Sequence, residues 1–388
     1  MKVNDLKILS DEYKLNPYLY IENLDRSKRV IVDSTLGTKV VICYKTAKEI
    51  LSKNDIFSTE PLAARAEPVM RGKVLAQMHG DEHKLKRSMI TRKITGGMLR
   101  EHYSEHLKYL CDQTIEKIRS KDKFDFIVDF GKEFSMLSTF KILGIDDRYV
   151  DFYYDRLRLI VKFATGFNLS DSEAEVYINA AIEMESAIIE LIEDKKINPG
   201  GDLVLFILAE GENDPNKKLS SSEIVALTLN VLLAASEPVD KVLSICIFHL
   251  LRDKHLLKGI ISGGIKSNDI LQETLRITPP VHLIPRLAVE DYTTESGDKI
   301  NNGDVVFILL PAVNRDSEYF ENPDIFNPTR TFKGHASYGS GIHTCIGAQF
   351  ANLQLNLALE RLAPLLLEYE EVEPPVFSGI CCFFCDVT

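Results

Sequence analysis

The sequence predicts a mainly helical fold with small β-sheets, and two observations support this prediction. Apolar residues recur at helical spacing from about residue 47 to about residue 258, most clearly over 101–119, 124–143 and 173–195. Short runs typical of strands lie outside that region, over 30–33, 39–43, 286–290 and 305–310, and again from about residue 369. We therefore expect helices to form most of the fold.

The individual elements follow from local patterns. The runs at 30–33 and 39–43 flank a turn at 35–38 and are expected to pair as a hairpin, with a short helix over 47–52. An apolar stretch over 224–251 indicates a central buried helix. A long loop over 314–343 and a last helix after Cys345 complete the order. No Gly/Ser/Pro-rich linker marks a boundary, so one domain over residues 1–388 is expected.

Composition excludes several classes of function. The formal net charge of −11 makes nucleic acid an improbable partner, because phosphate binding needs a basic face. The first 25 residues are polar and contain neither a signal peptide nor a membrane-spanning run, which predicts a cytoplasmic protein without membrane attachment. Seven cysteines at irregular spacing do not suggest a disulfide framework, and Cys381, Cys382 and Cys385 are expected to be apolar residues of terminal strands.

The most informative segment runs from Tyr338 to Gly347 and places Cys345 among glycines. Glycines at 339, 341 and 347 allow positive φ angles and close approach of the backbone to a large planar ligand. A thiolate that faces backbone N–H groups has a lowered pKa and a tuned donor strength. A haem iron with one axial cysteinate fits this arrangement best.

This segment resembles the cysteine-ligand loop of the cytochromes P450, with Tyr338 where the family usually has Phe. The resemblance implies the cytochrome P450 fold, in which helices enclose a b-type haem (iron protoporphyrin IX), with Cys345 as iron ligand. Tyr338, His343 and Gly347 would belong to the cofactor site. The expected activity is that of a haem-thiolate monooxygenase.

Two further segments repeat the resemblance. Glu273 and Arg276 stand at i and i+3 on one face of a predicted helix, and the family supplies a second arginine, here Arg330, to form a buried network. We expect this network to lock the loop that carries Cys345. His83 and Arg87, at i and i+4, match the family's haem propionate ligands, and so do Arg286 and His343.

Electron delivery is expected on the helix that contains His83. Lys84, Lys86, Arg87, Arg92 and Lys93 form a basic face there, against the negative sign of the whole chain. The resemblance places this helix beside the cysteine face of the haem, where an acidic ferredoxin or flavodoxin would dock.

The predicted central helix departs from the family pattern. Glu237 supplies the usual acid, but Pro238 stands where the family typically has a threonine that shapes proton delivery. A proline inside a helix removes an N–H and collides with the preceding turn, so we expect a kink that frees a carbonyl near Ala234. Protons would then come through Glu237, Ser236, ordered water or the substrate itself.

These residues are compatible with three alternative functions. Substrate-assisted monooxygenation would need a ligand with its own donors and acceptors, such as an amide. Peroxide-driven fatty-acid hydroxylation occurs in relatives with proline at this position, but Glu237 would repel the fatty-acid carboxylate. The third alternative is a non-catalytic haem-binding sensor, for which nothing positive is visible in the sequence.

The segments 234–241 and 273–286 are similar to one bacterial subgroup, which oxidises the cyclic dipeptide cyclo(Leu-Leu) to pulcherriminic acid. A cyclic dipeptide carries amide groups next to the oxidised atoms, which agrees with the missing hydroxyl. Substrate contacts can be predicted only by position in the fold, and about half of the candidates are expected to touch ligand. They are Leu62, Val69 and Met70 in a loop before the His83 helix, Phe163, Phe167, Leu233, Ala234, Val281, His282, Leu283 and Ile284.

Overall fold

The computed structural model describes residues 3–166, 169–198, 200–331, 333–373, 377–380 and 385–387. The chain divides into two compact units. Unit 1 comprises Met1–Pro61, Lys241–Cys345 and Leu362–Thr388, and unit 2 comprises Leu62–Asp240 and Ile346–Arg361. Two long helices, α11 (Ser221–Arg252) and α15 (Ala348–Leu366), each contribute residues to both units.

Unit 1 holds the strands and several short helices. Its helices are α1 (Asp11–Leu15), α2 (Pro17–Glu22), α3 (Tyr44–Ser52), α12 (Lys254–Ser262), α13 (Ser267–Ile277) and α14 (Leu310–Val313). Its strands are β1 (Val30–Asp33), β2 (Thr38–Val41), β3 (Phe57–Ser58), β4 (Leu283–Ala288), β5 (Tyr292–Thr293), β6 (Lys299–Ile300), β7 (Val305–Leu309), β8 (Phe377–Ile380) and β9 (Cys385–Val387).

Unit 2 is helical in the part that the structure describes. Its helices are α4 (Ala63–Met70), α5 (Gly80–Ile94), α6 (Gly96–Arg119), α7 (Lys132–Leu143), α8 (Val150–Thr165), α9 (Asp171–Ile197) and α10 (Leu203–Asn213). The predicted mainly helical fold with small sheets is therefore confirmed.

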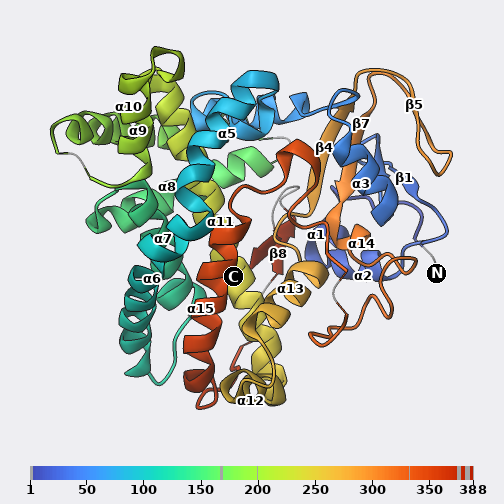
Figure 1. Cartoon of the computed structure of the whole chain (residues 1–388). Helices are drawn as coiled ribbons and strands as arrows, with labels where there is room; N and C mark the ends of the chain where they lie inside the picture. Colours follow the sequence, from blue (N-terminus) through green and yellow to red (C-terminus); the bar gives the residue numbers. More distant parts are fainter. Residues whose placement is uncertain are drawn as a thin grey trace. The chain divides into compact units, whose positions relative to one another are not determined.

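The largest sheet has the strand order β1-β2-β7-β4-β3. β1 and β2 form the predicted antiparallel hairpin, β2 pairs with β7 in parallel, and β7 pairs with β4 antiparallel. Figure 1 shows the blue hairpin beside the orange strands, so segments that are far apart in sequence meet in this sheet. Its apolar side chains pack on α3, with Val41, Ile50 and Leu310 among the buried residues of this core.

Three boundaries differ from the predictions for physical reasons. Helix α3 begins at Tyr44 rather than 47, because the Asp316 carboxylate accepts a hydrogen bond from the Tyr44 N–H at 2.8 Å. A distant cap of this kind leaves no local sequence signal. The predicted helix over 124–143 begins with a π-helical turn, Ile127–Gly131, and becomes α-helical only in α7.

The third difference concerns the segment before α5. Val69 and Met70 were expected in a loop, but they belong to helix α4, which contains Pro68 near its end. Both side chains are buried in the described coordinates. The sequence did not predict this helix because α4 is short and contains Pro68, and a proline inside a segment usually indicates the end of a helix.

Helix α11 is longer and more regular than expected. It begins after a reciprocal cap in which Ser220 N–H donates to Glu223 Oε2 at 2.9 Å and Glu223 N–H donates to Ser220 Oγ at 3.3 Å. The helix then continues without interruption through Pro238 to Arg252. The predicted opening of the helix at Pro238 is therefore not seen, although the Ala234 carbonyl still lacks the N–H that a non-proline residue would offer.

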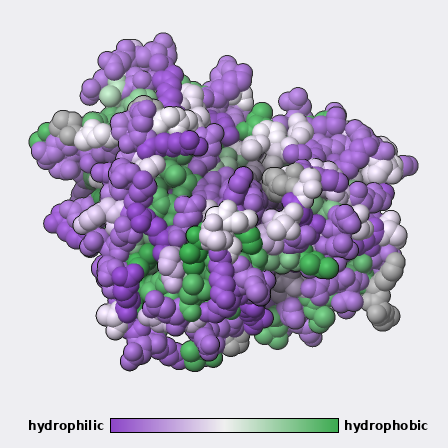
Figure 2. All heavy atoms as spheres, turned by 60° about the horizontal axis from the view of Figure 1, so that its bottom comes forward, coloured by the Kyte–Doolittle hydropathy of each residue, from purple (hydrophilic) through white to green (hydrophobic). Residues whose placement is uncertain are grey.

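None of the helices within the described residues has the length and apolar composition to cross a membrane. The face drawn in Figure 2 is mostly hydrophilic, with hydrophobic residues in smaller patches.

Candidate functional site

The loop before Cys345 is a compact turn in unit 1. Cys345 N–H donates to the Tyr338 carbonyl at 2.8 Å, and Gly339 N–H donates to the Ala336 carbonyl at 2.8 Å. Among the described cysteines Cys345 is exposed, whereas Cys43, Cys111 and Cys246 are buried. An exposed thiol held by its own backbone bond is arranged to meet a ligand rather than to fill the core.

Two of the three glycines in this loop have the geometry that the sequence predicted. Gly339 and Gly341 have φ angles of +70° and +72°. A Cβ at Gly341 would also lie 2.6 Å from the Leu51 carbonyl oxygen, so a larger residue would displace the loop. Gly347 is different, since it is not in the left-handed region and a Cβ there would meet nothing within 4 Å.

Tyr338 and His343 frame the same loop. Burial raises the pKa of the Tyr338 hydroxyl, and the charge of Cys345 raises it further. The aromatic ring of Tyr338 lies 5.4 Å from the ring of His335. His343 ends a short helical turn, Gly341–His343, two residues before Cys345.

Arg286 is a buried cation that the described residues satisfy only in part. It lies on β4 with 3% of its surface exposed, and its Nη1 donates to the Pro285 carbonyl at 2.8 Å. No hydrogen-bond acceptor for Nε is found among the described residues. Burial lowers the pKa of Arg286 to about 10. A buried guanidinium with an unused donor calls for an anion, and a haem propionate fits this requirement.

Glu273, Arg276 and Arg330 lie together in unit 1. Arg276 Nε and Nη2 donate to the two carboxylate oxygens of Glu273 at 2.8 and 2.7 Å. Arg330 Nε lies 3.1 Å from both oxygens. Arg276 Nη1 also donates to the Asn314 carbonyl at 2.8 Å, and Asn314 Nδ2 donates to Ser337 Oγ at 2.8 Å. The network thus reaches the residue before Tyr338.

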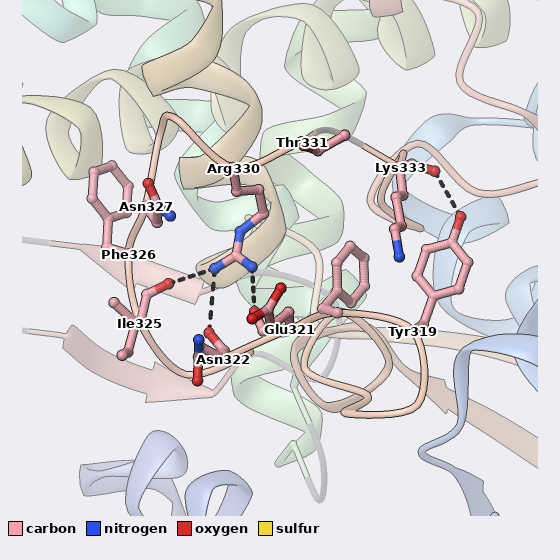
Figure 3. Close-up of a pocket in the computed structure, with 10 residues that line it drawn as sticks. Tyr319, Glu321, Asn322, Ile325, Phe326, Asn327, Arg330, Thr331 and Lys333 are labelled. Atoms are coloured by element: carbon pink, nitrogen blue, oxygen red, sulfur yellow. Dashed lines mark hydrogen bonds between the residues drawn. The ribbon is translucent and has the colours of Figure 1, made fainter.

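The outer side of Arg330 borders a cavity of about 400 Å³ (Figure 3). Arg330 Nη2 donates to the carbonyls of Asn322 and Ile325 at 3.2 and 2.9 Å, and Nη1 donates to the Glu321 carbonyl. Every nitrogen of the guanidinium is therefore occupied by protein acceptors. Arg330 therefore fixes the segment from Glu321 to Ile325 and does not present an unused donor to a ligand in the cavity.

In unit 2, His83 and Arg87 lie one turn apart on α5. His83 is buried and Arg87 is half-buried. Burial, and secondly the charge of Arg87, lowers the pKa of His83. His83 is therefore held in its neutral form, which donates one hydrogen bond and carries no charge.

The basic face of α5 is smaller than the sequence suggests. Lys86 is buried, and its Nζ lies 2.8 Å from Glu82 and 2.9 Å from Glu223. Arg92 pairs with Glu210 at 2.9 Å. Lys86 is therefore excluded from a docking surface, whereas Lys84 is strongly exposed, with its Nζ 3.2 Å from the exposed Asp81.

Helix α11 exposes one small residue, Ala234, among buried and half-buried neighbours. Ala234 is exposed, whereas Leu232 and Leu233 before it are buried, as is Ser236 after it. Ser236 Oγ donates to Thr139 Oγ1 at 3.1 Å, and Thr139 Oγ1 donates to the Ser135 carbonyl at 2.9 Å. This hydroxyl chain ends at a backbone carbonyl in α7, so it does not continue as a proton path.

The remaining substrate candidates differ in exposure. Leu62, Phe163, Val281 and Ile284 are half-buried, and Leu283 is buried. His282 is fully buried, with its Nε2 3.2 Å from the Tyr18 hydroxyl, which favours a packing role. Phe167 lies outside the described residues, as do Cys381 and Cys382.

Asn230, a polar residue near Ala234, was not among the candidate site residues predicted from the sequence. Asn230 lies one helical turn before Ala234 on α11, and its Oδ1 accepts a hydrogen bond from the Leu75 N–H at 3.3 Å. Its i, i+4 spacing to Ala234 was readable from the sequence, but the contact with Leu75 comes from a segment that is distant in sequence.

Comparison with known proteins bears on these observations. A family model described as Cytochrome P450 matches residues 12–261 and 267–374. The chain is similar to Pulcherriminic acid synthase of Bacillus subtilis (strain 168), with 36% identity over 375 residues, covering 93% of this chain and 92% of the relative. A putative cytochrome P450 of the same organism is 23% identical over 351 residues, covering 89% and 86%.

Solved structures show the same fold. A Bacillus megaterium cytochrome P450 in complex with testosterone aligns with a TM-score of 0.85 and 23% identity, covering 97% of each chain. A cytochrome P450 in complex with (4-ethylphenyl) dihydrogen phosphate aligns with a TM-score of 0.86 and 22% identity, covering 100% of this chain and 97% of the other. At these identities the likeness concerns the fold alone.

Proposed function

This chain belongs to the cytochrome P450 family of haem b monooxygenases, and on that premise we propose that it oxidises a small amide-bearing metabolite. The first candidate is the cyclic dipeptide cyclo(Leu-Leu), with pulcherriminic acid as product. The observation that carries this proposal is the segment from Ala234 to Pro238, where Ala234 is exposed, Glu237 supplies an acid, the Ser236 hydroxyl donates to Thr139 and Pro238 has no hydroxyl. The 36% identical relative named Pulcherriminic acid synthase supports the choice of substrate.

The cofactor roles follow from the residues already described. We assign Cys345 as the residue whose thiolate would hold the haem iron, with Tyr338 and Gly347 completing its loop. Arg286 and His343 are assigned to haem propionates, and His83 and Arg87 have the same assignment. When bound, haem supplies dioxygen activation and transfer of an oxygen atom to substrate.

Proton supply distinguishes this proposal from a generic monooxygenase. Pro238 has no hydroxyl, and the hydroxyl of Ser236 is committed to Thr139. Glu237 is then the side chain of this segment that holds and moves protons, and the amide N–H and C=O groups of the substrate supply the remaining hydrogen bonds. A ligand without polar groups would leave this part of the helix without a complete relay.

The proposed electron source is a ferredoxin or flavodoxin. Lys84 is a strongly exposed cation of α5, and its ion pair with the exposed Asp81 leaves it accessible to an acidic partner. Lys86 is excluded because it is buried between Glu82 and Glu223.

The test is a ligand titration followed by turnover. Cyclo(Leu-Leu) is expected to shift the haem spin state of the purified protein and, with a ferredoxin or flavodoxin system, to yield oxidised product detected by mass spectrometry. A response to long-chain fatty acids alone would favour the peroxide-driven hydroxylase. Indifference to every oxidisable ligand would favour the sensor.

The iron ligand is tested separately by Cys345→Ala. This variant is expected to lose the thiolate-type absorption of the reduced carbon monoxide complex, because alanine offers no sulfur to the iron. Retention of that absorption would contradict the assignment. Cys111→Ala, which removes a buried thiol, serves as the matched control.

A further inference from the structure

We propose that Asn230 recognises a carbonyl group of the substrate by donating a hydrogen bond from its Nδ2 amide. The inference rests on the proposed function, since it names the residue that selects an amide-bearing ligand. It concerns unit 2 alone and follows from the geometry around one face of α11.

Asn230 lies on the same stripe of α11 as the exposed Ala234. An α-helix has 3.6 residues per turn, so positions 230, 234 and 237 fall on one face, within about 60° of each other. Ala234 is exposed and Asn230 is partly exposed, while Leu229 and Leu233 beside them are buried. This stripe is therefore an open part of the helix surface, beside the half-buried Val231, Ala235 and Pro238.

The segment between α4 and α5 covers the stripe up to Asn230. A Cβ at Gly72 would lie 3.1 Å from the Cβ of Ala226, one turn before Asn230. Leu75 N–H then reaches Asn230 Oδ1 at 3.3 Å. The backbone of this segment thus packs on Ala226 and Asn230, and Ala234 is the next residue along the stripe.

The bond from Leu75 fixes which way the Asn230 amide points. A backbone N–H needs an acceptor, so the oxygen of the amide must face Leu75 and the NH2 group must face away from it. Within the described part of the chain, Leu75 N–H is the one hydrogen-bond partner of this side chain. Both Nδ2 hydrogens therefore remain available to a ligand.

The segment that holds Asn230 is itself braced. Val74 N–H donates to Gln77 Oε1 at 2.8 Å, and Gln77 Nε2 donates to Glu67 Oε1 on α4 at 3.0 Å. Leu75 lies between these two anchors. The donor to Asn230 is thus held by neighbouring hydrogen bonds, which reduces the conformational freedom lost when a ligand binds.

The polar groups along the stripe define a class of ligand. Asn230 offers a donor, and Glu237 offers an acceptor seven residues later, about 10 Å further along the helix axis. A neutral ring with a carbonyl at one edge and an N–H at the other meets both groups. A cyclic dipeptide has this pattern, whereas a fatty acid brings a negative charge towards Glu237 and no N–H.

The experiment measures ligand affinity in the holoenzyme by equilibrium dialysis. The ligands are cyclo(Leu-Leu) and its dithiocarbonyl analogue, which keeps the ring, the N–H groups and the side arms but is a weaker acceptor. The variants are Asn230→Ala, which removes the amide, and Asn230→Asp, which keeps an oxygen for Leu75 and loses the NH2 donor. Ser221→Ala, at an exposed site at the start of α11, is the control.

The effect of replacing the ligand carbonyl on affinity is expected to depend on whether Asn230 is present. In the wild-type protein the dithiocarbonyl analogue should bind roughly tenfold more weakly than cyclo(Leu-Leu), since the Asn230 donor, covered by the bound ligand, meets a poorer acceptor. Both Asn230 variants should bind cyclo(Leu-Leu) weakly and should lose little further affinity for the analogue. Ser221→Ala should behave as wild type.

Two results would overturn the inference. One is wild-type affinity of both Asn230 variants for cyclo(Leu-Leu). The other is an equal loss for the analogue in wild type and in Asn230→Ala, which would mean that the carbonyl meets another residue. A wild-type protein that binds no cyclic dipeptide is a different outcome, because it overturns the proposed function and this inference together.

Discussion

At the scale of single residues, Cys345 and Arg286 have surroundings that suit contact with a ligand. Cys345 is exposed on a loop closed by its own backbone N–H, and Arg286 is buried with an Nε donor for which no described residue supplies an acceptor. The unfilled donor of a buried guanidinium is unfavourable by itself and is stabilised when an anionic ligand binds.

Replacing Arg286 by Met should separate cofactor binding from protein stability. Removal of a buried cation without a full set of partners is expected to leave the free energy of unfolding of haem-free protein unchanged or higher. Haem loss should become faster, by roughly tenfold if one charge-assisted hydrogen bond is lost. Transfer of haem to apomyoglobin measures the rate.

Arg119→Met, on an exposed site of α6, is the control for loss of one positive charge. An Arg286→Met protein that keeps its haem as long as wild type would contradict the propionate assignment.

Networks between elements explain how the cysteine loop is held. Glu273 and Arg276 come from α13, and Arg330 comes from the long segment after α14. Arg276 is fully buried and Glu273 nearly so. Since the carboxylate is shared by two guanidinium groups, the segment and the helix are fixed to each other.

Replacing Glu273 by Gln should therefore destabilise the fold. Two buried or nearly buried arginines would lose their shared anion, at a cost of about 3 to 5 kcal/mol in the free energy of unfolding. Urea denaturation measures this value. The matched control is Glu318→Gln, whose exposed pair with Arg29 should contribute about 1 kcal/mol or less. Equal losses in the two variants would argue against a buried network.

Helix α11 supplies the second test at this scale. Pro238→Thr adds an N–H for the Ala234 carbonyl and a hydroxyl at the position where this chain has none. Haem content should stay intact, while the ratio of product formed to electrons consumed should change. The measurement compares NAD(P)H consumption with product in a reconstituted system. Complete loss of haem would show that Pro238 shapes the fold rather than the chemistry.

At the scale of the whole molecule, stability should depend on pH through buried histidines. Burial lowers the pKa of His249 to about 4, of His335 to about 4 and of His282 to about 3. In the unfolded chain each of these histidines has a pKa of about 6.5. Between these limits the unfolded state binds more protons, so stability is full above about pH 6.5 and falls as the pH drops towards 4.

Each histidine should contribute at most about 1.4 kcal/mol per pH unit to that slope. Unfolding free energies from urea titrations between pH 4 and 7 measure it. His249→Phe, which keeps a ring stacked on Phe326 at 3.9 Å, should reduce the slope, and His255→Asn at an exposed site should not. An unchanged slope in His249→Phe would contradict the prediction.

Local pattern alone determined the helical character, the hairpin of β1 and β2, and the positions of Cys345, Glu273 and Arg276. These are short-range signals, since periodicity, turn glycines and fixed spacing act within a few residues. The same sequence reasoning placed Arg330 in the network only through a family resemblance.

Tertiary structure decided what each polar side chain can reach. The cap of Asp316 on α3, the burial of Lys86 between two acids, the commitment of Ser236 to Thr139 and the orientation of Asn230 by Leu75 all join residues far apart in sequence. Hydrogen bonds depend on distances of a few ångströms between such residues, and no local pattern encodes those distances. The sequence therefore predicts which side chains could react or bind a ligand. The tertiary structure determines which of them already have a partner within the protein.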